Sequence, residues 1–139
     1  MPGPLDGIRV VDVSAILAGP LATMMLADQG ADVIKIEPPG IGDLMRLSPF
    51  RRGGMGAFFA SGNRGKRSAA IDLRTPKGRE ILLELVKRAD VFVQNFRPGV
   101  VERLGLDYAA VRAINPRLVY ASISGYGDTG PWVARPGQD

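Results

Sequence analysis

The sequence lacks two residue types on which many enzymes depend: among its 139 residues there is no cysteine and no histidine. Their absence excludes disulfide bonds, thiol catalysis and general acid–base catalysis by imidazole. A zinc site is not expected either, because proteins bind zinc mainly through these two side chains. Any catalysis by residues 1–139 would have to rest on carboxylates, lysines, tyrosines, hydroxyls or backbone amides. We predict no bound metal.

Long hydrophobic runs are also missing. The most apolar stretch, residues 15–27, contains Gly19, Pro20 and Thr23, and it is shorter than the ~20 residues that span a bilayer. No basic segment precedes an apolar one at the N-terminus, so we predict no signal peptide. We therefore expect a cytoplasmic protein that does not act on a membrane.

What is present is typical of a folded domain, either one with an anionic partner or a mildly basic housekeeping protein. The chain is 45% hydrophobic and 23% charged, with a net charge of +4 and a pI of about 9.9. Its length allows one domain with a hydrophobic core. The positive charge favours an anionic partner, but it does not distinguish nucleic acid, a phosphate-bearing ligand and acidic lipid.

Predicted strands and helices alternate along the chain. Strands are predicted at residues 8–13, 32–36, 69–73, 91–93 and 118–124, and helices at 21–28, at 108–114 and from Pro76 through Val86. Residues 40–67 are predicted to be irregular, and 125–139 to form a loop rich in glycine and proline. Apolar strands that alternate with helices predict an α/β fold with a Rossmann-like, doubly wound, mainly parallel sheet.

Ligands bind such sheets at the carboxyl ends of the strands. Four segments are expected at that edge: residues 14–20, Glu37 onward, 95–99 and 125–139. The sequence of residues 95–99, Asn-Phe-Arg-Pro-Gly, is the most specific of the four. It combines an amide that can donate and accept hydrogen bonds with a cation and a tight turn, although a plain surface turn stays possible.

The sequence does not match two familiar nucleotide-binding motifs. A dinucleotide fingerprint needs three glycines after the first strand, whereas this chain has Gly19 followed by Pro20. Glu37, at the end of the second strand, is then a structural or loop-anchoring residue. Residues 65–68, Gly-Lys-Arg-Ser, resemble a P-loop, but they precede a strand instead of following one, so backbone amides cannot cradle a phosphate at a helix start.

Basic residues cluster in the middle of the chain without any acidic residue among them. Those between residues 51 and 67 are Arg51, Arg52, Arg64, Lys66 and Arg67, and Arg74, Arg97 and Arg103 follow. Several guanidinium groups on loops at one sheet edge would suit a ligand with separate phosphates, although a solvated basic loop is the alternative. Phe58 and Phe59 could stack bases, but we expect no nucleic acid because aromatic residues make up only 6% of the chain.

Many short motifs in one order resemble the N-terminal part of the family III coenzyme A transferases, which include carnitine and formyl-CoA transferases and the α-methylacyl-CoA racemases. The motifs are LDGIRV at 5–10, AGP at 18–20, GADVIKIE at 30–37, NRGKRS at 63–68, DL at 72–73, ADV at 89–91, NFRPG at 95–99, RLGL at 103–106, NPRL at 115–118, GYG at 125–127 and GP at 130–131. The resemblance covers essentially the whole chain, and the number of motifs makes it far more specific than any one of them.

The resemblance implies a single CoA-binding, Rossmann-like domain over residues 1–139, incomplete relative to the family, in a subunit that forms an interlocked homodimer. It also implies that the basic segment at 64–67 faces the CoA phosphates. The residues expected to bind CoA are Ile16, Leu17, Arg64, Arg67, Ile71, Arg74, Asn95, Phe96, Arg97, Arg103, Leu104 and Gln138. The expected partners are an acyl-CoA and a carboxylate.

The family's chemistry uses an aspartate nucleophile that attacks the thioester, and such carboxylates divide a hard transfer into easier steps. That aspartate lies in a Gly-Asp motif further along the chain, so Asp139 matches only an auxiliary acidic position, and these residues alone are expected to be inactive. Gln138 stands where racemases place a histidine, and Leu17 where formyl-CoA transferases place a glutamine. An acyl or carnitine-type transferase is therefore favoured, with a racemase-like enzyme or a non-catalytic CoA-binding module as alternatives.

Overall fold

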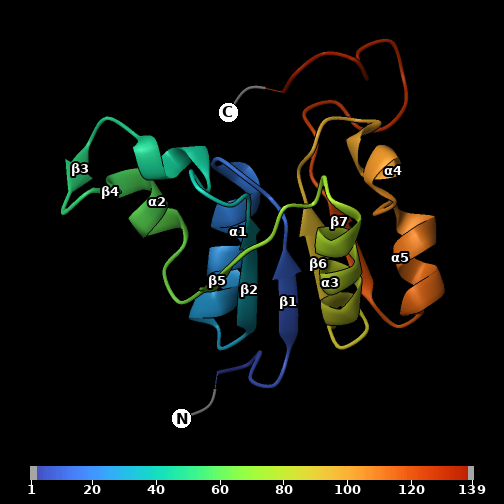
Figure 1. Cartoon of the computed structure of the whole chain (residues 1–139), viewed down its shortest axis with the longest axis horizontal. Helices are drawn as coiled ribbons and strands as arrows, with labels where there is room; N and C mark the ends of the chain where they lie inside the picture. The colour runs from blue at the N-terminus through green and yellow to red at the C-terminus, as the bar shows by residue number, and fades with distance from the viewer. Residues whose placement is uncertain (1–2, 138–139) are drawn as a thin grey trace.

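The computed structural model describes residues 3–137, and within that range five parallel strands form the main sheet (Figure 1). Their order across the sheet is β5-β2-β1-β6-β7. The strands are β1 (Arg9–Asp12), β2 (Asp32–Glu37), β5 (Arg67–Ala70), β6 (Val91–Gln94) and β7 (Val119–Ser122). The predicted doubly wound, Rossmann-like α/β fold is thus confirmed.

Helices cover both faces of this sheet, as Figure 1 shows, and alternate residues of each strand point to opposite faces. They are α1 (Ala18–Asp28), α3 (Pro76–Val86), α4 (Val100–Leu104) and α5 (Tyr108–Ile114). Val10 of β1 packs in one buried cluster with Leu26 of α1, whereas its neighbour Val11 packs in a second cluster with Leu82 of α3. None of the helices in the described part of the chain is long and apolar enough to cross a membrane.

Capping side chains explain where two helices begin. The Thr75 hydroxyl accepts a hydrogen bond from Gly78 N at 3.0 Å, and Pro76 occupies the first turn of α3. The Asp107 carboxylate accepts a hydrogen bond from Ala110 N at 3.0 Å at the start of α5. The helix α5 occupies the residues predicted for it, and α3 begins at the predicted Pro76.

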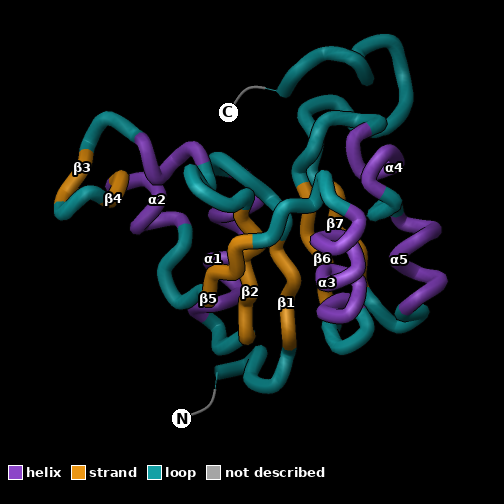
Figure 2. The backbone as a smooth tube through the Cα atoms, viewed as in Figure 1, coloured by secondary structure: helices purple, strands orange, loops and turns teal. Residues whose placement is uncertain are grey.

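The prediction that residues 40–67 are irregular is wrong. Four short elements lie there: η1 (Leu44–Leu47), β3 (Arg51–Arg52), β4 (Met55–Gly56) and α2 (Ala57–Gly62). Figure 2 shows that they form a small projection at the end of the sheet nearest β5. The helix α4 was also not predicted, and β5 begins two residues earlier than expected, since short elements carry too few residues for a periodic pattern.

The strand order creates a topological switch point at β1. This strand pairs with β2 on one side and with β6 on the other, and both pairings are parallel. The chain leaves β1 toward β2 and later crosses to the opposite half of the sheet. In sheets of this kind a crevice opens outside the carboxyl ends of the two strands at that point.

Candidate ligand-binding site

A cavity of about 530 Å³ lies at the switch point, beyond the carboxyl ends of β1, β6 and β7. This volume is within the range of small-molecule sites. We call it the β1–β6 pocket, and its lining residues are Ala15 to Ala18, Asn95 to Pro98, Ile123 to Gly127, Val133 and Arg135 to Gly137. Three of the four segments predicted to reach this edge therefore meet here.

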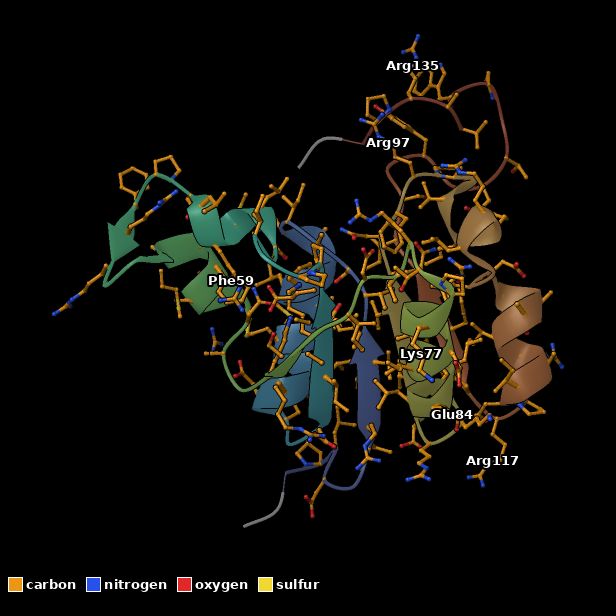
Figure 3. All side chains as sticks on the ribbon, viewed as in Figure 1. Phe59, Lys77, Glu84, Arg97, Arg117 and Arg135 are labelled. Atoms are coloured by element: carbon orange, nitrogen blue, oxygen red, sulfur yellow. The ribbon has the colours of Figure 1, made fainter. Side chains whose placement is uncertain are left out.

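The pocket is mainly apolar, and its charged lining residues are positive. Among the described residues that line it, Arg97 and Arg135 are charged and none is acidic. Figure 3 shows both arginines at the same end of the molecule, over the carboxyl ends of the strands. The Arg135 guanidinium also lies 5.3 Å from the Trp132 ring centre, which orients it. This combination suits a ligand that has an anionic part and an apolar part.

The floor of the pocket is the turn after β1, and Asn95 fixes its backbone. The Asn95 Nδ2 donates to Ala15 O at 2.8 Å, and Ala15 N donates to Asn95 Oδ1 at 2.8 Å. Both functional groups of the amide are thus used on the protein. Asn95 lies at the pocket as predicted, but its amide holds the pocket's shape.

A buried ion pair holds the same turn from its other side. Lys35 Nζ lies 2.9 Å from Asp43 Oδ2, and both side chains are only 1% exposed. Lys35 Nζ donates to Ser14 O at 2.9 Å. Asp43 in turn accepts a hydrogen bond from Ile16 N at 3.2 Å.

Glu37 anchors the loop that carries Asp43, which confirms its predicted structural role. Its carboxylate accepts two hydrogen bonds from Arg46, each 2.7 Å, one from Ser68 and one from Asp43 N at 2.9 Å. Burial alone would raise the pKa of Glu37, but the hydrogen bonds from Arg46 and Ser68 outweigh it and lower that pKa to about 2. The loop is therefore attached to the sheet by a charge that stays ionised.

Lys66, from the basic segment, is buried and does not face the pocket. Its ammonium group donates to Asp12 Oδ2 at 3.0 Å, to Pro20 O at 2.8 Å and to Asn63 Oδ1 at 2.8 Å. Burial lowers the pKa of Lys66, and the Asp12 carboxylate opposes that shift. Lys66 thereby joins the loop before β5 to the end of β1 and to the first turn of α1.

The expectation that the basic residues share one sheet edge is wrong for Arg64 and Arg67. Arg64 forms an ion pair with Asp28, the last residue of α1. Arg67 donates to both carboxylate oxygens of Asp32, at 2.9 and 2.7 Å, and Asp32 is the first residue of β2. Both arginines therefore lie at the amino ends of the strands, opposite the β1–β6 pocket.

The other predicted residues fall into two groups. Ile16, Leu17, Phe96 and Arg97 line the pocket. Four more lie outside its lining: Ile71 and Leu104 pack against the core, Arg74 pairs with Asp72 at 2.9 Å, and Arg103 lies against the Gly99 turn. Gln138 and Asp139 are outside the described residues.

Several lining residues were not predicted individually. They come from the segment after β7, at 123–127 and 133–137. The signal was its position after the last strand, since glycine- and proline-rich loops at a carboxyl edge bind ligands through their backbone.

Within residues 3–137 no group of three or more acidic side chains is arranged to hold a metal ion.

The fold and the pocket define an α/β protein with arginines lining a pocket at the switch point of a Rossmann-like sheet. Residues 5–139 match the model of the CoA-transferase family III, and the chain belongs to this family. The resemblance seen in the sequence motifs is thus confirmed.

Known proteins of the family are closely similar over the whole chain. It is 48% identical to the acetyl-CoA:oxalate CoA-transferase of Acetobacter aceti, covering 99% of this chain and 35% of the relative. It is 45% identical to the human succinyl-CoA:glutarate CoA-transferase, covering 98% and 31%. A crystal structure of a CaiB/BaiF family protein from Brucella suis superimposes with a TM-score of 0.93 at 47% identity, covering 100% and 38%. The chain therefore spans about a third of the length of the curated relatives it matches.

Proposed function

We propose that the β1–β6 pocket binds the CoA part of an acyl-CoA, and that residues 1–139 form the CoA-binding domain of a CoA:carboxylate transferase. The observation that carries this proposal is that Arg97 and Arg135 both line a mainly apolar pocket at the switch point. CoA offers phosphates for the guanidinium groups and a long, nearly uncharged pantetheine arm for the apolar wall.

A dinucleotide is less well suited to this turn. Gly19 lies so close to Ser14 that a side chain at position 19 would overlap the Ser14 Cβ and Oγ atoms. Glycine at position 19 thus allows α1 to pack closely against the turn after β1. Pro20 follows it directly. The close backbone approach to a pyrophosphate that a dinucleotide fingerprint provides has no counterpart here.

The proposed reaction transfers CoA from an acyl-CoA thioester to a carboxylate acceptor. An aspartate outside residues 1–139 attacks the thioester carbonyl carbon, the C–S bond breaks, and CoA leaves as a thiolate while an acyl-aspartyl anhydride forms. The thiolate then attacks the aspartyl carbonyl and the original acyl group leaves as a carboxylate. The acceptor carboxylate next attacks the aspartyl-CoA thioester and releases the thiolate, which gives an acceptor-aspartyl anhydride. The thiolate finally attacks the acceptor carbonyl of this anhydride, which releases the acceptor as a CoA thioester and restores the free aspartate. We further propose that the whole protein is a homodimer.

The relatives suggest the acceptors to test. The whole protein, including any sequence beyond residue 139, is incubated with acetyl-CoA or succinyl-CoA and with oxalate or glutarate, and new CoA thioesters are identified by mass spectrometry. Hydroxylamine traps an aspartyl thioester or anhydride as a hydroxamate, which labels the nucleophile. A new thioester together with a labelled aspartate supports the proposal. CoA binding without exchange would instead favour a non-catalytic CoA-binding module, and epimerisation of a 2-methylacyl-CoA a racemase-like enzyme.

A further inference from the structure

Ile16, at the floor of the β1–β6 pocket, has a strained backbone. Over the described range 3–137 it is the one residue other than glycine with a positive φ, at 71°. This left-handed conformation is unfavourable for any residue with a Cβ and most unfavourable for a β-branched one. Such strain persists only where surrounding contacts enforce it.

Asp43 contacts the backbone of Ile16 directly. Both of its carboxylate oxygens lie 3.2 Å from Ile16 N. The same oxygens receive other donors, since Met45 N donates to Oδ1 at 2.9 Å and Lys35 Nζ lies 2.9 Å from Oδ2. Each oxygen of this carboxylate is therefore held by two fixed donors, and its position is determined from several sides.

Lys35 couples this carboxylate to the residue before the strained turn. Its ammonium group donates to Ser14 O at 2.9 Å while it pairs with Asp43. The two side chains thus hold the backbone on both sides of Ala15, and Asn95 holds Ala15 itself. Because Lys35 and Asp43 are both 1% exposed, water does not weaken these charge-assisted hydrogen bonds.

We propose that Asp43, oriented by Lys35, is a positioning residue that keeps Ile16 in the left-handed conformation and so shapes the pocket for CoA. Asp43 does not line the pocket, whereas Ile16 and Leu17 do. It therefore acts on the ligand only through the turn. This inference rests on the proposed function, because it assigns a role in the same site.

Replacing Asp43 by asparagine tests the role with little change in shape. Both carboxylate oxygens are acceptors, so the side-chain amide introduced by Asp43→Asn would place a donor against Lys35 or against Met45 N. The turn then loses the fixed acceptor for Ile16 N, and Ile16 can relax to a negative φ. We expect affinity for free CoA, measured by titration calorimetry, to fall about tenfold in Asp43→Asn. The reason is that most molecules of the variant would no longer hold Ile16 in the strained conformation that shapes the pocket.

The decisive comparison repeats this substitution in two other backgrounds. Ile16→Gly and Ile16→Ala both remove the side chain, but only glycine adopts a positive φ without strain. If Asp43 positions Ile16, Asp43→Asn weakens CoA binding about tenfold with alanine at position 16 and by less than about threefold with glycine there. A purely structural role for Asp43 would give the same loss in both backgrounds, and that result would overturn the proposal.

The remaining outcomes are also informative. If the wild-type protein does not bind CoA, the proposed function fails, whereas normal binding by a folded Asp43→Asn variant overturns only the positioning role. Should that variant not fold, the comparison uses Lys35→Met together with Asp43→Asn, which leaves no unpaired buried charge. If the paired variant is unfolded as well, the pair is a folding requirement and the proposal is wrong.

Discussion

The carboxamide of Asn95 binds both polar backbone groups of Ala15, a residue 80 positions earlier in the chain, with two hydrogen bonds of 2.8 Å. Asn95 directly follows β6, and Ala15 lies in the turn after β1. The two strands at the switch point are therefore joined by side-chain contacts beyond the end of their ladder. The shape of the β1–β6 pocket depends on this link.

Asn95→Ala is expected to weaken CoA binding about tenfold or more, because an unpaired, partly buried amide and carbonyl are left at Ala15. Titration calorimetry measures the affinity. Asn115→Ala is the matched control, since Asn115 Nδ2 also donates to two backbone carbonyls, those of Val86 and Ala89, but away from the pocket. The control is expected to lose stability and keep its affinity. An equal loss of affinity in both variants would contradict a local role for Asn95.

Arg97→Ala is expected to reduce CoA affinity about tenfold or more, because a hydrogen-bonded charge pair with a phosphate is lost. The affinity of the variant should also depend less on salt than that of the wild type. Arg64→Ala and Arg67→Ala are the controls, because both arginines pair with acidic residues at the opposite edge of the sheet. Weaker CoA binding in either control would show that the phosphates lie elsewhere.

Acid is expected to destabilise the fold through Glu37. Its folded-state pKa is about 2, below the ordinary value of 4.5. A lowered pKa contributes stability above the unfolded-state pKa, so this contribution, of about 3 kcal/mol, is complete above about pH 5 and disappears as the pH falls toward 2. Urea unfolding at several pH values measures it.

Glu37→Gln removes this titration, so the variant should lose less stability than the wild type between pH 5 and pH 2, although it is weaker at neutral pH. Glu84→Gln serves as control, because the Glu84 carboxylate is 59% exposed and pairs with Lys87 in an i,i+3 contact at the surface. Its acid profile should follow that of the wild type. If Glu37→Gln also follows the wild type, another carboxylate is responsible for the acid sensitivity.

Gly19→Ala is expected to lower the free energy of unfolding by about 1–3 kcal/mol, because the added methyl group overlaps Ser14. Gly62→Ala is the control, since nothing lies within 4 Å of a Cβ built at that glycine. The control is expected to be neutral or slightly stabilising. Thermal denaturation measures both, and equal melting temperatures would show that the β1 turn can move away from α1.

The sequence predicted the central strands β1, β2 and β6 well because they are mostly buried runs rich in β-branched residues. The start of α3 was equally clear, since Thr75 and Pro76 are local signals. The segment 40–67 was not predictable in the same way. Its short elements depend on contacts between distant residues, such as Arg46 lying 3.8 Å from the Phe59 ring centre.

The site was only partly predictable for a similar physical reason. A cluster of basic residues in sequence says nothing about which acidic residues they meet, and Arg64 and Arg67 meet Asp28 and Asp32 from other elements. One signal was present and was missed. Lys35 interrupts an apolar strand, and a buried lysine needs a carboxylate partner, which Asp43 provides.

Hydrogen exchange of backbone amides, followed by mass spectrometry with and without CoA, tests the location of the site most directly. We expect slower exchange in the segments that line the pocket, at residues 15–18, 95–98 and 123–127, and unchanged exchange at residues 63–67. Protection at residues 63–67 without protection at the pocket would contradict this placement of the site.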